Sequence, residues 1–198
     1  MELVLVDKNN YKKAIEVQNK IFPKENGTIN ILASLGRELF MKTAGIYYED
    51  DHIKYYLAKE NNDYIGITGL YSYDTTDAWL AWFGILEEYQ NKGLGRELLR
   101  NTLELAKSLE YKNLRLYTDP VDNFKAIKLY EKEGFIKEDY TTEELPFKCL
   151  IYSKSLTNNK VDLWNNKNLG LSYQTELDHM DDNKINEILK KYEEMKWE

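Results

Sequence analysis

A change of periodicity between residues 84 and 96 constrains the fold of this chain more than any other feature. Before it, Ala78–Ile85 is dense in aromatic and aliphatic residues, as in a strand; after it, Gly95–Glu110 has the apolar spacing of an amphipathic helix. Gly93 and Gly95 lie where one pattern gives way to the other. The first N–H groups of a helix lack internal partners, and aligned peptide dipoles make that end partly positive. The pattern therefore predicts a site for a phosphate or diphosphate.

This glycine loop differs from two common phosphate-binding motifs. It lacks the Gly-Lys-Ser/Thr ending of a Walker loop. It also lacks the third glycine and the distal acidic residue of a dinucleotide fingerprint. Two glycines taken alone are equally compatible with a plain tight turn between a strand and a helix, so a second signal is needed.

The second signal lies on a predicted helix at Asn123–Glu133. Asn123 is a favourable N-cap residue, and Gly134 is placed to end the helix. Ala126 and Tyr130 share one face at i, i+4 spacing. We expect this face to turn toward the core or toward a cleft.

The order of the predicted elements favours an α/β (α+β) sandwich, with helices covering a partly antiparallel sheet. Seven strands are expected, at Leu3–Val6, Lys54–Lys59, Tyr64–Tyr73, Ala78–Ile85, Asn113–Thr118, Phe135–Tyr140 and Cys149–Leu156. Four helices are expected, at Tyr11–Phe22, Ile29–Met41, Gly95–Glu110 and Asn123–Glu133. The composition becomes polar after Leu156, which predicts a domain at 1–156 and a C-terminal extension at 157–198 with an amphipathic helix near 183–197.

Composition narrows the classes of function. The formal net charge of −7 argues against nucleic-acid binding, which needs clustered Lys and Arg, and mildly favours cationic acceptors such as amines. His52 and His179 have no partner at metal-ligand spacing, so no metal is expected. No apolar run reaches the roughly 20 residues that span a bilayer, and the N-terminus has no secretory pattern, so we expect a cytoplasmic protein without a membrane partner. The single cysteine, Cys149, is expected to be a small strand hydrophobe.

Together the two motifs resemble the GNAT superfamily of N-acetyltransferases. The run Gln90–Gly95 (QNKGLG) is similar to that superfamily's Q/R-x-x-G-x-G/A loop, and the Asn123-to-Gly134-Phe135 pattern follows at the matching distance. Over roughly residues 2–156, the resemblance implies a GNAT-type mixed, mostly antiparallel sheet of six to seven strands covered by about four helices. It implies acetyl-CoA as cosubstrate, no metal, and direct attack of a primary amine on the thioester in a ternary complex. One departure is Glu87, where many relatives carry proline.

The resemblance also implies roles for individual residues. The strand end at Phe83 and Ile85 would offer backbone groups to the pantetheine arm, with a backbone N–H near Ile85 as oxyanion donor. Asn123 would bond the cofactor, and Tyr130 would lie near the thioester sulfur as the general acid. The diphosphate would be held by the amides of Gln90, Asn91, Lys92, Gly93, Leu94, Gly95 and Arg96.

Several questions stay open at this stage. The acidic stretch Glu49–His52 and Asp77 are candidates for a general base, but such charges are usually solvated loops, and a water chain would also serve. A small-molecule amine is favoured over a protein acceptor, with its specificity expected from Tyr11–Met41 and later loops. The alternatives are a longer acyl donor, or a non-catalytic acyl-CoA-binding sensor of the same fold. A monomer or homodimer is expected.

Simple alternation predicts the face of each aromatic residue on the strand Ala78–Ile85. On a regular strand, Trp79 and Phe83 share one face and Trp82 lies on the other. Core packing is the favoured role for all three, although the position of the strand end also allows one of them to line the acceptor cleft.

Overall fold

The computed structural model describes residues 1–46, 53–121, 123–140, 149–164 and 180–197. Seven strands in these residues form one sheet in the order β1-β2-β3-β4-β5-β7-β6. The strands are β1 (Glu2–Leu5), β2 (Lys54–Glu60), β3 (Asp63–Tyr71), β4 (Asp77–Ile85), β5 (Asn113–Thr118), β6 (Ile136–Tyr140) and β7 (Cys149–Ser155). All neighbours pair antiparallel except β4 and β5, which are parallel. The predicted mixed, mostly antiparallel sheet is confirmed.

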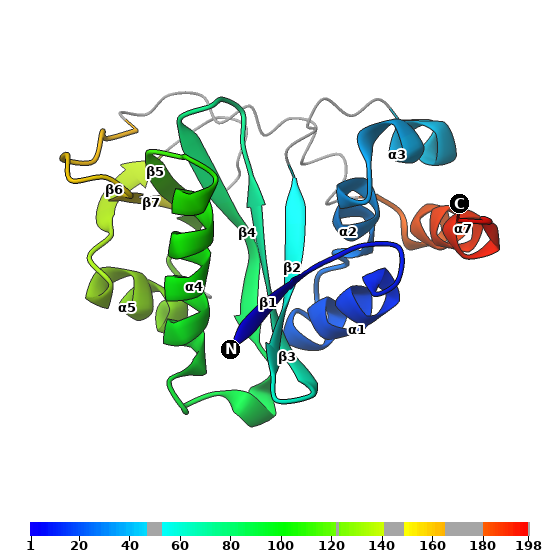
Figure 1. Ribbon diagram of the computed structural model, residues 1–198, viewed down its shortest axis with the longest axis horizontal. Helices are drawn as coiled ribbons and strands as arrows, with labels where there is room; N and C mark the ends of the chain where they lie inside the picture. The colour runs from blue at the N-terminus through cyan, green and yellow to red at the C-terminus, as the bar shows by residue number, and fades with distance from the viewer. Residues whose placement is uncertain (47–52, 122, 141–148, 165–179, 198) are drawn as a thin grey trace.

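Helices cover both faces of the sheet (Figure 1). They are α1 (Tyr11–Ile21), α2 (Thr28–Ser34), α3 (Arg37–Ala44), α4 (Leu94–Ser108), α5 (Phe124–Lys132) and α7 (Asp182–Glu194), with a short 3₁₀ turn, η1, at Glu87–Tyr89. The helix predicted at Ile29–Met41 is in fact two helices, α2 and α3. The chain breaks at Gly36, whose φ of 149° lies outside the range of a helix. No helix among the described segments is long and apolar enough to cross a membrane.

Of the three apolar clusters among the described residues, the two largest lie on opposite faces of the sheet, and the third is a small cluster around Ile65 and Leu98. The larger core joins α1, α2, α3 and α7 to one face, and its fully buried members include Ile29, Phe40 and Leu57. The second core joins α4 and α5 to the other face through residues such as Leu99 and Tyr130. Burial of these apolar surfaces is the main force that fixes the helices on the sheet.

A β-bulge in β4 changes which face its aromatic residues occupy. Gly69 pairs with Ala81, whereas Ile67 pairs with Gly84, so β4 has one more residue than β3 over this interval. Trp82 adopts a φ of 32° within it. As a result, Trp79 and Trp82 contact the same core, and Phe83 contacts the opposite one. Assignment by simple alternation was therefore wrong, because a bulge shifts the side-chain phase of a strand by one residue.

The parallel ladder between β4 and β5 is short. It joins Asp77–Trp79 to Asn113–Arg115. Beyond this point the two strands continue as Leu80–Ile85 and Leu116–Thr118, and a pocket lies between them. The bulge in β4 falls within the diverging part, which agrees with the tendency of bulges to bend a strand away from its neighbour.

A buried ion pair anchors the start of this parallel ladder. Arg115 Nε donates to Asp77 Oδ2 at 2.6 Å, and Asn113 Nδ2 donates to Asp77 Oδ1 at 2.8 Å. Arg115 also donates to Ser153 Oγ at 2.8 Å on β7. Asp77 is 5% exposed and Arg115 is 2% exposed. The expectation that Asp77 is a solvated loop residue was therefore wrong: a partner from the neighbouring strand compensates the burial of its charge.

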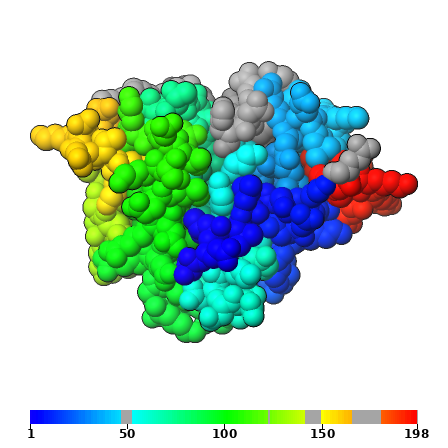
Figure 2. Space-filling model, viewed as in Figure 1, coloured from blue at the N-terminus to red at the C-terminus, as the bar shows by residue number. Residues whose placement is uncertain are grey.

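The C-terminal helix α7 lies against the N-terminal helices, as the red and blue surfaces of Figure 2 show. Ile185, Ile188 and Tyr192 are buried in the larger core. The Tyr192 hydroxyl donates to the Leu32 carbonyl at 3.3 Å, which ties α7 to α2. A second tie joins the start of α7 to the α1–α2 loop, where Asn26 Nδ2 donates to Asp182 Oδ1 at 2.9 Å.

Removal of one member of the buried ion pair should cost more than removal of both. We expect Asp77→Ala to lower the free energy of unfolding by about 3–5 kcal/mol, because it leaves the Arg115 guanidinium buried and uncompensated. The double variant D77A/R115M should recover part of this loss, since a methionine needs no counter-ion. Urea unfolding of the three proteins at pH 7 measures both values. Equal losses in the single and double variants would contradict the assigned role.

Candidate functional site

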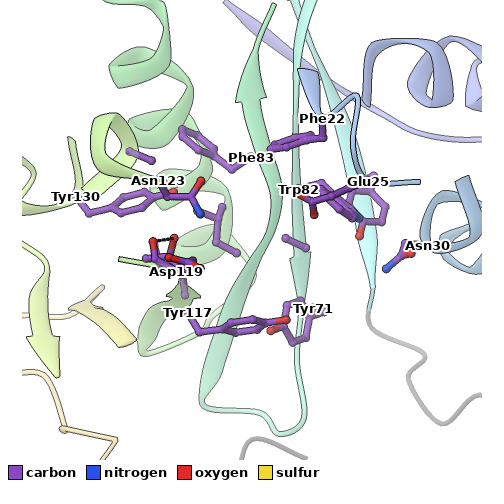
Figure 3. A pocket seen from close by; sticks show the side chains of 16 residues that line it. Phe22, Glu25, Asn30, Tyr71, Trp82, Phe83, Tyr117, Asp119, Asn123 and Tyr130 are labelled. Atoms are coloured by element: carbon purple, nitrogen blue, oxygen red, sulfur yellow. Dashed lines mark hydrogen bonds between the residues drawn. The ribbon is translucent and has the colours of Figure 1, made fainter. Parts of the chain in front are cut away.

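A pocket of about 450 Å³ lies where β4 and β5 separate (Figure 3). The diverging strands supply two walls, with Leu80–Phe83 from β4 and Leu116–Asp119 from the end of β5. Helix α5 supplies Asn123, Ala126 and Tyr130. The opposite side is formed by Phe22, Glu25, Asn30, Tyr55 and Tyr71. The pocket therefore occupies the gap that opens once the parallel ladder has ended.

Tyr130 lies on the α5 side of this pocket and is 5% exposed. Its ring contacts Phe83, Phe135 and Tyr152 at centroid distances of 6.2, 5.7 and 5.8 Å. Burial raises the pKa of the Tyr130 phenol above its ordinary value, because the charged phenolate is poorly solvated there. The hydroxyl is therefore protonated at neutral pH and available as a donor.

Asn123 stands at the start of α5, as its position in the sequence predicts. Its carbonyl accepts from the Ile127 N–H at 2.9 Å, but its side chain makes no capping bond. The side chain instead lines the pocket beside Tyr130 (Figure 3). Phe83 reaches the same pocket from β4. Three of the predicted cofactor residues are thus brought together around one cavity.

The predicted phosphate loop lies at the end of β4 and the beginning of α4 (Figure 1). Glu87 begins the 3₁₀ turn η1, which the Gln90 N–H closes by donating to the Glu87 carbonyl at 3.0 Å. The Gln90 side chain donates to the Ile85 carbonyl at 3.0 Å. The loop is therefore held to the strand end by its own first residue.

The backbone of this loop has the properties of an anion cradle. The amides of Asn91–Gly95 make no hydrogen bond to any backbone group in the described part of the chain, whereas the Arg96 N–H donates to the Gly93 carbonyl at 3.1 Å. Gly93 has a φ of 80°, and a Cβ placed there would meet no atom within 4 Å. Open space, unused N–H groups and the positive end of α4 together fit a diphosphate.

Glu133 links the phosphate loop to the helix that carries Tyr130. Its carboxylate accepts from Arg96 Nε and, at 3.0 Å, from Arg100 Nε, so the end of α5 is joined to the first turns of α4. The Glu133 side chain is 7% exposed, while those of both arginines are at least half exposed. The bond from Arg100 is the main cause that lowers the pKa of Glu133 below its ordinary value, and Arg96 adds to the effect. No pattern in the sequence indicates this link.

The predicted site residues therefore fall into two groups. Phe83, Asn123 and Tyr130 line the pocket, whereas Ile85 and the loop Gln90–Arg96 lie beyond its edge, on the continuation of β4. Ile85 is buried and pairs with Gly66 in the β3–β4 ladder. The acidic stretch Glu49–His52, considered as a source of a general base, lies outside the described residues.

Sequence reasoning missed the acidic residues of the pocket. Asp119 directly follows β5, and a carboxylate at the end of a strand in a parallel pair is a recognisable signal. Glu25 lies in the loop between α1 and α2, where local sequence carries no such signal. Tyr117 and Tyr71 also line the cavity. Their strand positions predict half-buried rings without indicating a pocket.

The single cysteine has the inert environment that was expected. Cys149 is fully buried in β7, next to β5. Burial, with a smaller contribution from the Asp119 charge, raises its pKa to about 11. The thiol is therefore protonated at neutral pH and is not poised as a nucleophile. Among the described residues, no three His, Cys, Asp or Glu side chains are placed to hold a metal ion.

Comparison with known proteins identifies the family. The protein-family model described as "Acetyltransferase (GNAT) family" matches residues 26–135, which is more than half of the chain. The chain belongs to the GNAT acetyltransferase family. The matched region contains the loop before α4, the pocket walls on β4 and β5, and Tyr130.

The chain is similar in sequence to a curated acetyltransferase and in fold to two solved structures. A spermine/spermidine N(1)-acetyltransferase from Bacillus subtilis (strain 168) is 33% identical over 99 residues, which cover 48% of this chain and 60% of that protein. An aminoglycoside 6′-acetyltransferase type Ii has a TM-score of 0.63 at 15% identity, over 81% of this chain and all of the other. The ribosomal-protein-S18-alanine N-acetyltransferase from Escherichia coli has a TM-score of 0.61 at 16% identity, over 82% and 98%. These two structures show a shared fold.

The link between Glu133 and the two arginines gives a pH-dependent contribution to stability. Because the pKa of Glu133 is lowered on folding, its contribution is complete above the ordinary glutamate pKa of about 4.3 and is lost as pH falls through the lowered value. We expect Glu133→Gln to be less stable than the parent at pH 7, with the difference shrinking below about pH 4. Urea unfolding between pH 7 and pH 3 measures it, with Glu104→Gln on the exposed side of α4 as control. A difference as large at pH 3 as at pH 7 would contradict the assignment.

Proposed function

We propose that this chain transfers an acetyl group from acetyl-CoA to a primary amine of a small molecule, by direct attack in a ternary complex. One observation carries the proposal: a single strand, β4, leads from a pocket that holds Tyr130 into a loop of unused amides at the start of α4. A thioester in the pocket and a diphosphate on the loop would be parts of one extended ligand. Membership of the GNAT acetyltransferase family supports the same donor.

The curated relatives support a small-molecule acceptor. The match spans 60% of the length of the first relative, which is named for spermine and spermidine. The segment predicted to face the acceptor, Tyr11–Met41, supplies Phe22, Glu25 and Asn30 to the pocket. An acceptor that enters from this side would meet the donor near Tyr130.

The cofactor contacts follow from the two groups of residues in the site. In the proposed complex, the amides of Asn91–Gly95 hold the diphosphate, as the unused N–H groups and the dipole of α4 favour. Phe83 and Asn123 contact the arm of the cofactor inside the pocket. An N–H near Ile85 is proposed as the oxyanion donor. Acetyl-CoA supplies an activated thioester carbonyl, and the protein supplies position and proton transfer.

Tyr130 is proposed as the proton donor for the leaving thiolate. The amine nitrogen forms a bond to the carbonyl carbon while the C–S bond breaks; the ammonium loses two protons in all, the thiolate gains one, and one proton goes to solvent. A thiol has a pKa near 8.5, well below the raised pKa of the buried phenol. Tyr130 therefore acts first through a hydrogen bond to the developing thiolate, and any proton it gives up is restored from solvent.

We propose the same division of the chain that its composition suggests. Residues 1–156 form the acetyltransferase domain, and residues 157–198 form an extension with the helix α7. The buried positions of Ile185, Ile188 and Tyr192 support a role of this extension in completing the larger core. A truncated chain that lacks 157–198 would expose that apolar surface.

A thiol-release assay tests the proposed activity directly. Purified protein with acetyl-CoA and a panel of small primary amines should release coenzyme A at a rate that depends on the amine. Calorimetry with coenzyme A should register binding in the absence of an amine. Binding without amine-dependent release over the whole panel would instead support an acyl-CoA sensor of the same fold.

Replacement of Tyr130 by phenylalanine should separate chemistry from binding. We expect turnover to fall about 100-fold, because the departing thiolate loses its donor, while coenzyme A affinity stays close to that of the parent. Tyr152→Phe is the matched control: its ring neighbours that of Tyr130, but its hydroxyl donates to Glu131 at 3.1 Å. Steady-state kinetics and calorimetry on both variants measure the difference. Equal turnover in Tyr130→Phe and the parent would remove Tyr130 from the mechanism.

A further inference from the structure

The pocket between β4 and β5 has an unusual combination of side chains. Two charged residues, Glu25 and Asp119, occur among the described residues that line the cavity, and both are acidic. The other lining residues are apolar, uncharged polar or aromatic. The aromatic ones are Phe22, Tyr55, Tyr71, Trp82, Phe83, Tyr117 and Tyr130. Carboxylates together with ring faces form a surface that attracts cations and repels anions.

The two carboxylates lie on different sides of this cavity (Figure 3). Asp119, at the end of β5, lies close to Asn123 and Tyr130. Glu25, in the loop between α1 and α2, lies beside Trp82 on the other side. One acidic group is therefore near the proposed reaction centre, and the other is remote from it.

The side chains between the two carboxylates are mainly aromatic. Tyr117 and Tyr71 lie next to each other along the lower edge of the pocket in the close view, Tyr117 toward Asp119 and Tyr71 toward the Glu25 side (Figure 3). Trp82 packs on Phe22 with its ring centroid 5.0 Å away. Ring faces of this kind bind the methylene groups of a flexible chain and also tolerate an ammonium group nearby. A chain with one charge at each end would match this order of acidic, aromatic and acidic surfaces.

We infer that the acceptor of this site carries two amino groups, with the reacting amine on the Asp119 side and the distal ammonium bound by Glu25. This inference rests on the proposed function. It adds separate roles for Asp119, beside the reacting amine, and for Glu25, which binds the distal ammonium. At neutral pH both amines of such a molecule are protonated, since an alkyl ammonium group has a pKa near 10.4. The reacting ammonium loses two protons during transfer and keeps the third on the amide nitrogen. The distal amine keeps its charge throughout, so Glu25 is a specificity-determining residue that takes no part in the chemistry.

A comparison of a diamine with a monoamine of equal length tests the assignment. The parent protein should use 1,5-diaminopentane with a kcat/KM at least about tenfold higher than that for pentylamine, as loss of one charged contact predicts. Glu25→Gln should reduce this ratio at least about fivefold. Glu104→Gln removes an equal charge on the exposed side of α4 and should leave the ratio unchanged. An equal ratio in the parent and in Glu25→Gln, or no preference for the diamine in the parent, would overturn the inference.

A binding measurement separates this inference from the proposed activity. Calorimetry should show that 1,5-diaminopentane binds the parent more tightly than Glu25→Gln, whether or not turnover occurs. Glu25-dependent binding without thiol release would support the diamine site and contradict acetyl transfer. Thiol release at equal rates from diamine and monoamine would support acetyl transfer and contradict the diamine site.

Discussion

The pocket that holds Tyr130 depends on how short the parallel ladder between β4 and β5 is. Parallel β4 and β5 are joined along Asp77–Trp79 and Asn113–Arg115, and then they separate. The Asp77–Arg115 ion pair holds the strands together at the closed end, where both charges are buried. The bulge at Trp82 lies in the separated part. A gap within a sheet would normally leave backbone groups without partners, a cost that a bound ligand can offset. The early end of the ladder thus leaves a pocket between the two strands, where the acceptor and the thioester would meet in the proposed complex.

The two ends of the site beside β4 differ in charge. At one end, the N-terminus of α4 offers backbone amides and a partial positive charge. Within the pocket, the charged lining residues are Glu25 and Asp119. Aromatic side chains also line the pocket, and the rings of Phe83 and Tyr130 contact each other there. In the proposed complex, an anionic donor on the loop and a cationic acceptor in the pocket would each meet a surface of favourable charge, although the protein is acidic overall.

The sequence predicted the order of helices and strands along the chain, apart from the division of Ile29–Met41 into two helices, and a helix at Gly95–Glu110 that the structure has at Leu94–Ser108. Each of these depends on local pattern. The resemblance to the GNAT superfamily added three residues that line the pocket, Phe83, Asn123 and Tyr130. Periodicity shows where a helix begins, and glycine shows where a turn is possible. The bulge at Trp82 escaped prediction, since an inserted residue leaves the composition of a strand unchanged. Glu25 and the ties from Glu133 to Arg96 and Arg100 escaped it for another reason. They depend on contacts between segments far apart in the chain, which no local pattern records.

The hydrogen bond from Asn26 to Asp182 connects the C-terminal helix to the loop that presents Glu25. Lys191 connects the same helix to α3 by donating to the Thr43 carbonyl at 3.1 Å. Both hydrogen bonds lie on the face of the sheet opposite α4 and α5, away from the predicted phosphate loop Gln90–Arg96. If Glu25 selects the acceptor as proposed, changes in α7 would alter that selection through the α1–α2 loop and would leave the loop before α4 unchanged.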